Sequence, residues 1–140
     1  MKGLTSAIQT QIDAKLAKAS VPCEFIVACS DLTTALTTGT TKAYFRSPYA
    51  FTLTAVRASL GTAQASGSIF TVDINESGTS VISTKLTIDN TETTSTTAAT
   101  PAVISDSAIA DDSIIAIDID QVGDGTAKGL MVTLIGTHAV

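Results

Sequence analysis

The chain has 140 residues, which is enough for one domain with a buried core and too few for two independent domains. Its net charge of −5 and its 8 scattered Lys and Arg residues argue against a sequence-independent grip on nucleic acid, because that grip needs clustered cations to neutralise phosphates. With no Trp, 4% aromatic residues and 24 Thr residues, the composition favours an all-β domain with an aliphatic, β-branched core.

Residues 1–20 predict an N-terminal helical segment, followed by a β domain over residues 21–140. The helix, over residues 4–19, carries an apolar residue at every fourth position, which places these side chains on one helix face: Leu4, Ile8, Ile12 and Leu16. Val21-Pro22 is expected to end it, because the residue before a proline disfavours helical backbone. Two interpretations of this stripe stay open. Either it docks on its own domain, or it is an anchoring or oligomerisation segment that buries its apolar side chains in a neighbouring chain.

After Pro22 the apolar residues recur at every second position, which is the period of a half-buried strand. In the third such segment we expect Phe51, Leu53 and Ala55 to face the core. Thr-rich residues 91–100 predict either an exposed strand or a long loop. The predicted strands are residues 25–29, 42–46, 51–56, 70–75, 81–82, 86–88, 115–119 and 130–135, and residues 103–104 are expected to make one further short contact.

Two hairpins are predicted. Glu76-Ser77-Gly78 has the residues of a tight turn and connects strand 70–75 to the next strand. Gly123-Asp124-Gly125 closes strand 115–119, so we expect that strand to pair with 130–135, which is apolar enough to be covered on both faces.

About eight short strands without intervening helices fit an antiparallel, two-sheet β-sandwich, and jelly-roll wiring is one way to protect its edges. A seven-stranded immunoglobulin-like sandwich is the alternative, but its Cys and Trp landmarks are absent. The expected fold is therefore an all-β, jelly-roll-like sandwich preceded by a short N-terminal α-helix.

The two cysteines, Cys23 and Cys29, lie six residues apart in a strand-like run. Extended backbone would hold them about 20 Å apart on one face, too far for a disulfide between them. We therefore interpret them as small buried hydrophobic residues.

The sequence lacks the residues that catalysis requires. The sole histidine, His138, is the third residue from the end, and no Gly-rich phosphate loop is present. We expect no enzyme activity and no cofactor. Residues 1–20 also lack the apolar core of a signal peptide, and no apolar stretch is long enough to span a bilayer, so we expect a soluble product, made in a cytoplasm and not bound to a membrane.

An acidic cluster occupies residues 106–124, which contain no Lys or Arg. A solvated strand face is the favoured interpretation. The alternative is a divalent cation, which takes several carboxylate and carbonyl oxygens, with Asp118, Asp120 and Asp124 as weak candidate ligands.

Aromatic residues concentrate in residues 44–49. Alternation sends Tyr44 and Phe45 to opposite faces, so we expect one of them to be exposed. Filling of the core at a strand corner is one interpretation of this segment. The other is a protein-contact site formed by Tyr44, Arg46 and Tyr49, because exposed Tyr and Arg are typical of interface hot spots.

Four segments of the chain resemble a module found in virion proteins of tailed bacteriophages and prophages. They are residues 44–59, 72–76, 83–89 and 117–123, and the resemblance covers roughly residues 23–138. It implies a structural or adhesive role in a virus particle, with no catalytic residues. A short helix before one sandwich is more similar to a capsid decoration or head-fibre protein than to a complete tail fibre.

The resemblance also implies partners and a location. We expect the chain to bind the major capsid protein or another virion protein, to lie on the virion surface after synthesis in the host cytoplasm, and to form a homo-oligomer, with a trimer favoured. The alternative is a receptor- or glycan-binding module of a tail fibre or other adhesion structure, which would use loops 33–40, 61–67 and 91–100.

Overall fold

The computed structural model describes the backbone of residues 2–16 and 20–140 and the side chains of residues 6–13 and 20–140. The predicted stripe residues Leu4 and Leu16 therefore lie outside the described side chains. The elements are α1 (Lys2–Leu16), β1 (Ser20–Ala28), β2 (Gly39–Arg46), β3 (Phe51–Ser59), β4 (Phe70–Glu76), β5 (Thr79–Ser80), β6 (Ile82–Thr84), β7 (Leu86–Ile88), the single-turn helix η1 (Ser95–Thr97), β8 (Val103–Ile104), β9 (Ala108–Ile109), β10 (Ile114–Gln121) and β11 (Met131–Ala139).

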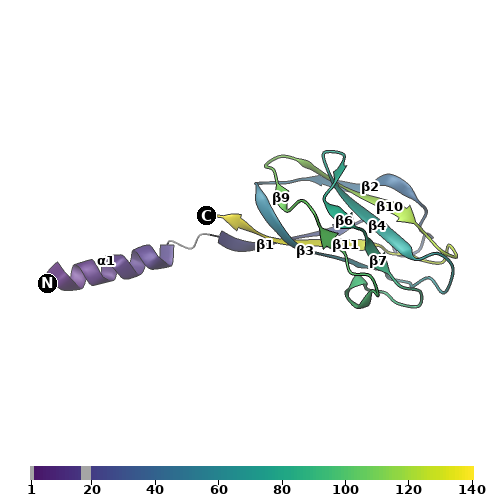
Figure 1. Cartoon of the computed structure of the whole chain (residues 1–140), viewed down its shortest axis with the longest axis horizontal. Helices are drawn as coiled ribbons and strands as arrows, with labels where there is room; N and C mark the ends of the chain where they lie inside the picture. Colours follow the sequence, from purple (N-terminus) through teal and green to yellow (C-terminus); the bar gives the residue numbers. More distant parts are fainter. Residues whose placement is uncertain (1, 17–19) are drawn as a thin grey trace.

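Two antiparallel sheets face each other across the core (Figure 1). The first, which we call the β1 sheet, has the order β1-β11-β3-β9, and the second, the β2 sheet, has the order β2-β10-β4-β5 with β7 also paired to β4. With the short β5 left aside, strands that follow one another along the chain lie in opposite sheets. The one exception among these strands is β4 and β7, which lie in the same sheet. This is the wiring of a jelly roll, so the predicted fold is confirmed.

The core consists of the apolar positions that the alternation selects. In β4, Phe70, Val72 and Ile74 are all fully buried, and β10 and β11 contribute buried residues in the same alternating way: Ile115, Ile117, Ile119, Val132 and Leu134. Branched aliphatic side chains at every second position fill the space between the two sheets. Both cysteines are buried and unpaired as predicted, and burial raises the pKa of Cys29 to about 11.

One predicted hairpin is confirmed and the other is wrong. Ser77 and Gly78, both with positive φ, turn β4 directly into β5. In contrast, β10 pairs with β2 and β4, and β11 pairs with β1 and β3, so the two strands lie in different sheets. Each of them is central in its sheet, and the long loop over residues 122–130 carries the chain across the sandwich between them. The outer face of β11 is also partly open, because Met131 is 43% exposed.

Two further local predictions differ from the structure. Val21 and Pro22 belong to β1, an edge strand, where proline is tolerated because one side of the strand lacks a hydrogen-bonding neighbour. In β3 the pairing with β11 slips by one residue near Thr54, so Val56 packs against the core in place of the predicted Ala55. The Thr-rich tract over residues 91–100 forms a loop that contains η1.

The two ends of the sandwich differ. Ser20 pairs with Ala139, so the start of β1 and the end of β11 lie together at what we call the terminal end (Figure 1). At the opposite, loop end, Lys128 forms bridges with both Ala35 and Thr62, and Ser59 bridges to Thr94. The loops predicted as a binding tip, 33–40, 61–67 and 91–100, therefore gather at the end remote from α1.

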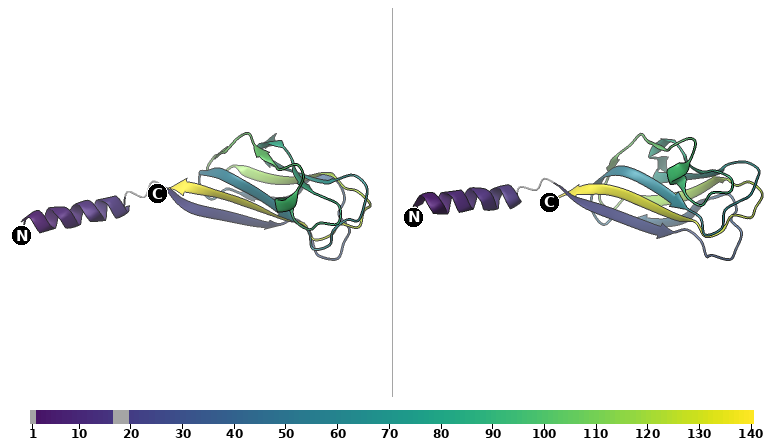
Figure 2. Two further views of the ribbon diagram at one scale, coloured as in Figure 1. Left: turned by 60° about the horizontal axis from the view of Figure 1, so that its bottom comes forward. Right: turned by 90° about the horizontal axis from the view of Figure 1, so that it is seen from below.

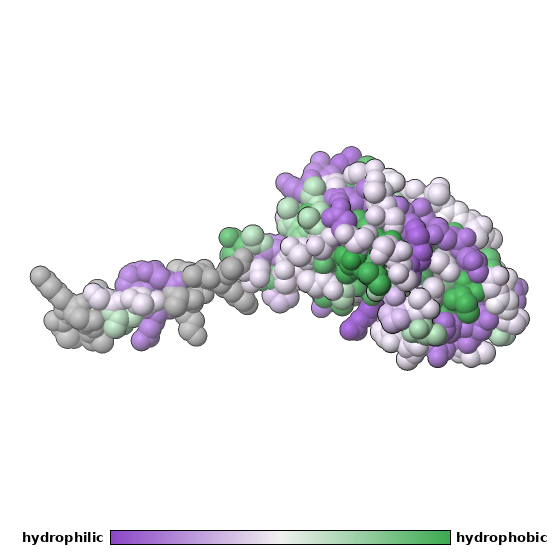
Figure 3. All heavy atoms as spheres, in the orientation of Figure 1, coloured by the Kyte–Doolittle hydropathy of each residue, from purple (hydrophilic) through white to green (hydrophobic). Residues whose placement is uncertain are grey.

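The described part of α1 does not pack against the sandwich. Its stripe residues Ile8 and Ile12 are 48% and 45% exposed, and the helix extends away from the terminal end in every view (Figures 1 and 2). Among the described residues, no helix is both long enough and apolar enough to cross a membrane. On the side of the sandwich seen in Figure 3, apolar surface is divided into separate patches among hydrophilic residues.

Candidate interaction surface

The outer face of the β2 sheet carries the predicted aromatic contact residues. Tyr44 of β2 lies opposite Ala116 of β10, and Arg46 lies opposite Ile114. Tyr44 is 65% exposed, whereas Phe45 points into the core and stacks on Phe25 with ring centroids 5.3 Å apart. The prediction that one of the two rings is exposed is therefore confirmed.

Tyr49 occupies a different environment. Its ring is half-buried and packs against the core, with its centroid 6.0 Å from that of Phe25 and 4.2 Å from that of His138. It fills the corner between β2 and β3, and the structure does not place it beside Tyr44. The sole histidine is held in the same aromatic contact, at the terminal end.

Tyr44, Arg46, Ile114 and Ala116 form a surface that we call the Tyr44 patch. Because Tyr44 faces the small Ala116, a shallow depression remains between them, which Ser77 and Gly78 also line. Arg46 lies at the rim of this depression and contacts Asp112. Its Nη1 donates a hydrogen bond to the backbone oxygen of Asp112 at 2.8 Å and lies 3.3 Å from the side-chain Oδ2 of the same residue. An exposed Tyr beside an Arg and an apolar Ile is typical of protein contacts.

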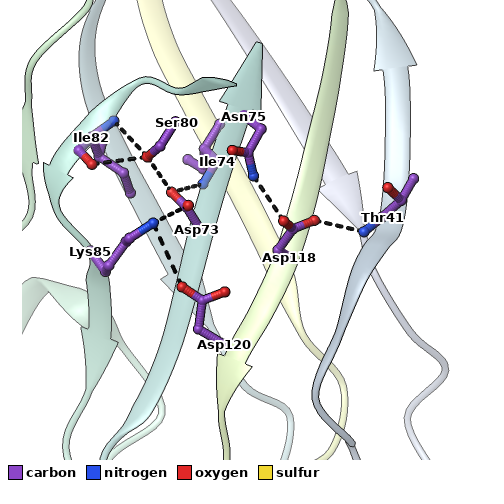
Figure 4. A network of polar contacts seen from close by, with 9 residues as sticks. All are labelled: Thr41, Asp73, Ile74, Asn75, Ser80, Ile82, Lys85, Asp118 and Asp120. Carbon is purple, nitrogen blue, oxygen red and sulfur yellow. Dashed lines mark hydrogen bonds and ion pairs between the residues drawn. The ribbon is translucent and has the colours of Figure 1, made fainter. Parts of the chain in front are cut away.

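Next to this patch, two residues of the predicted acidic cluster, Asp118 and Asp120, belong to a polar network (Figure 4). Asp118 lies on the outer face of β10, where Oδ1 accepts a hydrogen bond from the backbone N–H of Thr41 at 2.6 Å and Oδ2 accepts one from Asn75 Nδ2 at 2.9 Å. Thr41 has positive φ, in the part of β2 whose pairing with β10 is irregular. The carboxylate therefore satisfies an N–H that the irregular ladder leaves without a strand partner.

Asp73 of β4 is the buried member of the network, with 5% of its surface exposed. Its Oδ1 accepts hydrogen bonds from the hydroxyl of Ser80 at 2.6 Å and from the backbone N–H of Ile74, and its Oδ2 is paired with the ammonium of Lys85. The same ammonium lies 3.6 Å from Asp120 Oδ2. Although partial burial opposes it, the hydrogen bond and charge of Asp73, together with Asp120, raise the pKa of Lys85 above its usual value.

The structure does not bring the three weak metal candidates together. Asp118 and Asp120 share one strand face, but Asp124 lies in the loop after β10, where Thr126, Ala65 and Ser66 donate to it and lower its pKa to about 2. Among the described residues, no three His, Cys, Asp or Glu side chains are grouped to hold a metal ion, and no buried polar side-chain atom lacks a partner. These carboxylates hold segments of the chain to one another.

Sequence patterns did not reveal the partners of these carboxylates. Lys85 and Asn75 come from segments far from Asp118 in the chain, and nothing in their local pattern marks them. Gln64 is a further case, because it is fully buried and links the loop end by hydrogen bonds to Ser68, Asn90 and Gly123. A polar residue within a small-residue loop gave no sequence signal for this role.

We expect Lys85→Met to lower the free energy of unfolding by about 2 kcal/mol, because it leaves the buried Asp73 carboxylate without its counter-charge. Urea unfolding measures the change. Arg46→Met is the matched control, since its ion pair with Asp112 is exposed on both sides and should contribute less than about 1 kcal/mol. Equal losses in the two variants would contradict the role assigned to Lys85.

Comparisons with protein-family models, with curated proteins and with solved structures find no match to this chain. What the protein does is therefore inferred from the contacts and exposed surfaces of its own residues.

Proposed function

We propose that this chain is a structural virion protein of a tailed phage, and that it acts as a capsid decoration protein, of the cement or head-fibre type, which binds and stabilises the shell. The observation that carries the proposal is the apolar stripe of α1, whose described residues Ile8 and Ile12 remain exposed. An apolar helix face that its own domain leaves unburied is the usual mark of a segment that binds a partner.

The position of the Tyr44 patch also supports binding to the capsid through the terminal end. β2 runs from the loop end towards the terminal end, so Tyr44 and Arg46 lie near the end from which α1 departs. In the proposed arrangement this end faces the major capsid protein, and the loop end points outwards. Many copies, grouped as trimers, would bury surface on neighbouring capsid subunits and stabilise the shell by mass action.

The network around Asp73 and Asp118 favours binding over catalysis. A general acid or base needs a carboxyl group that reaches a substrate, whereas these two carboxylates are engaged by donors from Ser80, Lys85, Asn75 and Thr41. A rigid, non-catalytic sandwich suits a protein whose task is mechanical.

The alternative function is a receptor- or glycan-binding module of a tail fibre or other adhesion structure. The observation that favours it is the gathering of loops 33–40, 61–67 and 91–100 at the loop end, remote from the helix. Labelling virions with an antibody to the chain, viewed by electron microscopy, separates the two. Label over the head supports decoration, label at the tail tip supports the alternative, and virions without label overturn both.

We expect Tyr44→Ser to weaken binding of the full chain to capsids that lack it by about tenfold, because it removes the largest exposed side chain of the Tyr44 patch. A saturation binding assay with purified capsids measures this. Leu32→Ser is the control, since Leu32 is 70% exposed but lies in the loop after β1, at the loop end. A Tyr44→Ser protein that binds as tightly as the control would exclude the patch from the capsid contact.

A further inference from the structure

The outer face of the β1 sheet is nearly free of charge. In the right-hand view of Figure 2, β1, β11 and β3 run side by side across the near side of the sandwich. Glu24 and Arg57 are the only charged residues that these strands direct outwards. The outward positions, in register, are Pro22, Glu24, Ile26 and Ala28 of β1, Thr137, Ile135, Thr133 and Met131 of β11, and Thr52, Ala55, Arg57 and Ser59 of β3.

Apolar side chains are adjacent on this face. Ile26 is 66% exposed and Met131 is 43% exposed, and the strand pairing places them in neighbouring rows, with Ala28 opposite Met131. Ile135 lies one row beyond Thr133 on the same strand. Scattered exposed apolar residues need no explanation, but a contiguous group on a sheet face marks a surface that binds another protein.

The two charges on this face are complementary to each other and are separated by β11. Glu24 of β1 lies opposite Ile135 of β11. Arg57 of β3 lies opposite Thr133, the neighbouring outward residue of β11. Neither forms an ion pair with any residue that the structure describes, whereas Arg46 of β2 and Lys85, the residue before β7, both do. One copy of the face therefore offers an anion on one side and a cation on the other, which a second copy can match.

The position of α1 restricts how copies can meet. Residues 17–19 alone separate Leu16 from Ser20, and a connection of this length spans at most about 14 Å. Copies whose helices pack side by side in parallel must therefore bring the starts of their β1 strands close to a common axis. With that axis parallel to the strands, the Glu24 side of one β1 sheet meets the Arg57 side of the next, in a twofold or a threefold arrangement.

We propose that the outer face of β1, β11 and β3 is the self-association surface of this protein, and that it joins copies into a parallel cyclic oligomer. Ile26 and Met131 form the apolar centre of the contact, and Glu24 of one copy pairs with Arg57 of the next. This surface is distinct from the Tyr44 patch, which lies on the opposite sheet. The proposal concerns the protein alone and does not depend on the particle that the oligomer coats.

Charge reversal tests the pairing in the full-length chain. Sedimentation equilibrium gives the dissociation constant of the oligomer for Glu24→Arg, for Arg57→Glu and for the protein that carries both. Each single reversal places like charges together and should raise the dissociation constant roughly tenfold or more. The double variant restores opposite charges and should return to within about threefold of the unmodified protein.

A second pair of variants tests the apolar centre. Ile26→Ser should raise the dissociation constant about tenfold, and Leu32→Ser, equally exposed but at the loop end, should leave it unchanged. Thermal unfolding followed by circular dichroism verifies that each variant is folded. A monomeric unmodified protein at all soluble concentrations, or a double reversal that associates no better than either single reversal, would overturn the proposal. Because no particle is present, failure of capsid binding cannot produce either result.

Discussion

Gly136→Ala should lower the free energy of unfolding by at least about 3 kcal/mol, the upper range for overpacking a core. Gly136 is buried in β11, and a Cβ atom there would overlap the backbone oxygen of Thr52 and lie 3.0 Å from the ring of Phe51. A backbone oxygen in the middle of a sheet cannot rotate aside. The added methyl group must therefore displace β3 from β11 and disturb the core beneath them.

The pairing between β3 and β11 explains why the two backbones are so close at this point. Ile135 pairs with Ala55 and Gly136 pairs with Leu53, so Thr54 is the extra residue of a bulge, and its hydroxyl donates to the backbone oxygen of Ile135 at 3.1 Å. The bulge lets both Leu53 and Val56 face the core, which strict alternation would prevent.

Urea unfolding of Gly136→Ala beside Thr137→Ala measures the effect. Thr137 is the next residue of β11, on the outer face, and its replacement should change the free energy of unfolding by less than about 1 kcal/mol. If the two substitutions prove equally costly, the close approach at Gly136 does not limit what this position accepts.

The same bulge shows where sequence patterns stop being informative. Alternation correctly predicted that Phe51 and Leu53 face the core, because which face of a strand is apolar is a local property. It placed Ala55 inward because a register slip depends on the partner strand, which the local pattern does not contain. For the same reason the pattern located β10 and β11 but paired them wrongly, since the inner faces of two opposed sheets have the same alternation.

The candidate surfaces show the same limit: properties of one strand could be predicted from its sequence, and contacts between separate elements could not. Position along a strand predicts that one of Tyr44 and Phe45 is exposed and that Asp118 and Asp120 share a face, and the structure agrees. For Tyr49, which lies in the turn after β2 where alternation does not apply, the choice between core filling and protein contact could not be predicted. Nor could the pairing of Asp73 with Lys85 across β4 and β7, because a contact between side chains of separate elements leaves no periodic signal.

Removal of residues 1–19 should leave the sandwich folded and abolish its attachment to capsids, with a loss of affinity of about hundredfold or more. β1 begins at Ser20, and the buried core residues that the structure describes all lie from Cys23 to Leu134, so the truncated chain retains them. Its unfolding midpoint in urea should equal that of the full chain. Electron microscopy and a sedimentation assay with capsids then measure occupancy.

A second variant tests whether attachment to capsids requires the apolar stripe or only the presence of a helix. Ile8→Glu combined with Ile12→Glu keeps residues that favour a helix but places charge on the described part of the stripe, so it should reduce occupancy as the truncation does. Gln9→Glu adds one charge to the same helix at a position outside the stripe and should coat capsids normally. Full occupancy by the truncated chain would show that α1 is not the anchor, and the Tyr44 patch would then be the principal contact with the shell. Loss of occupancy in the truncated and stripe variants, with normal coating by Gln9→Glu, would instead place the anchor on one face of α1, where the apolar side chains recur.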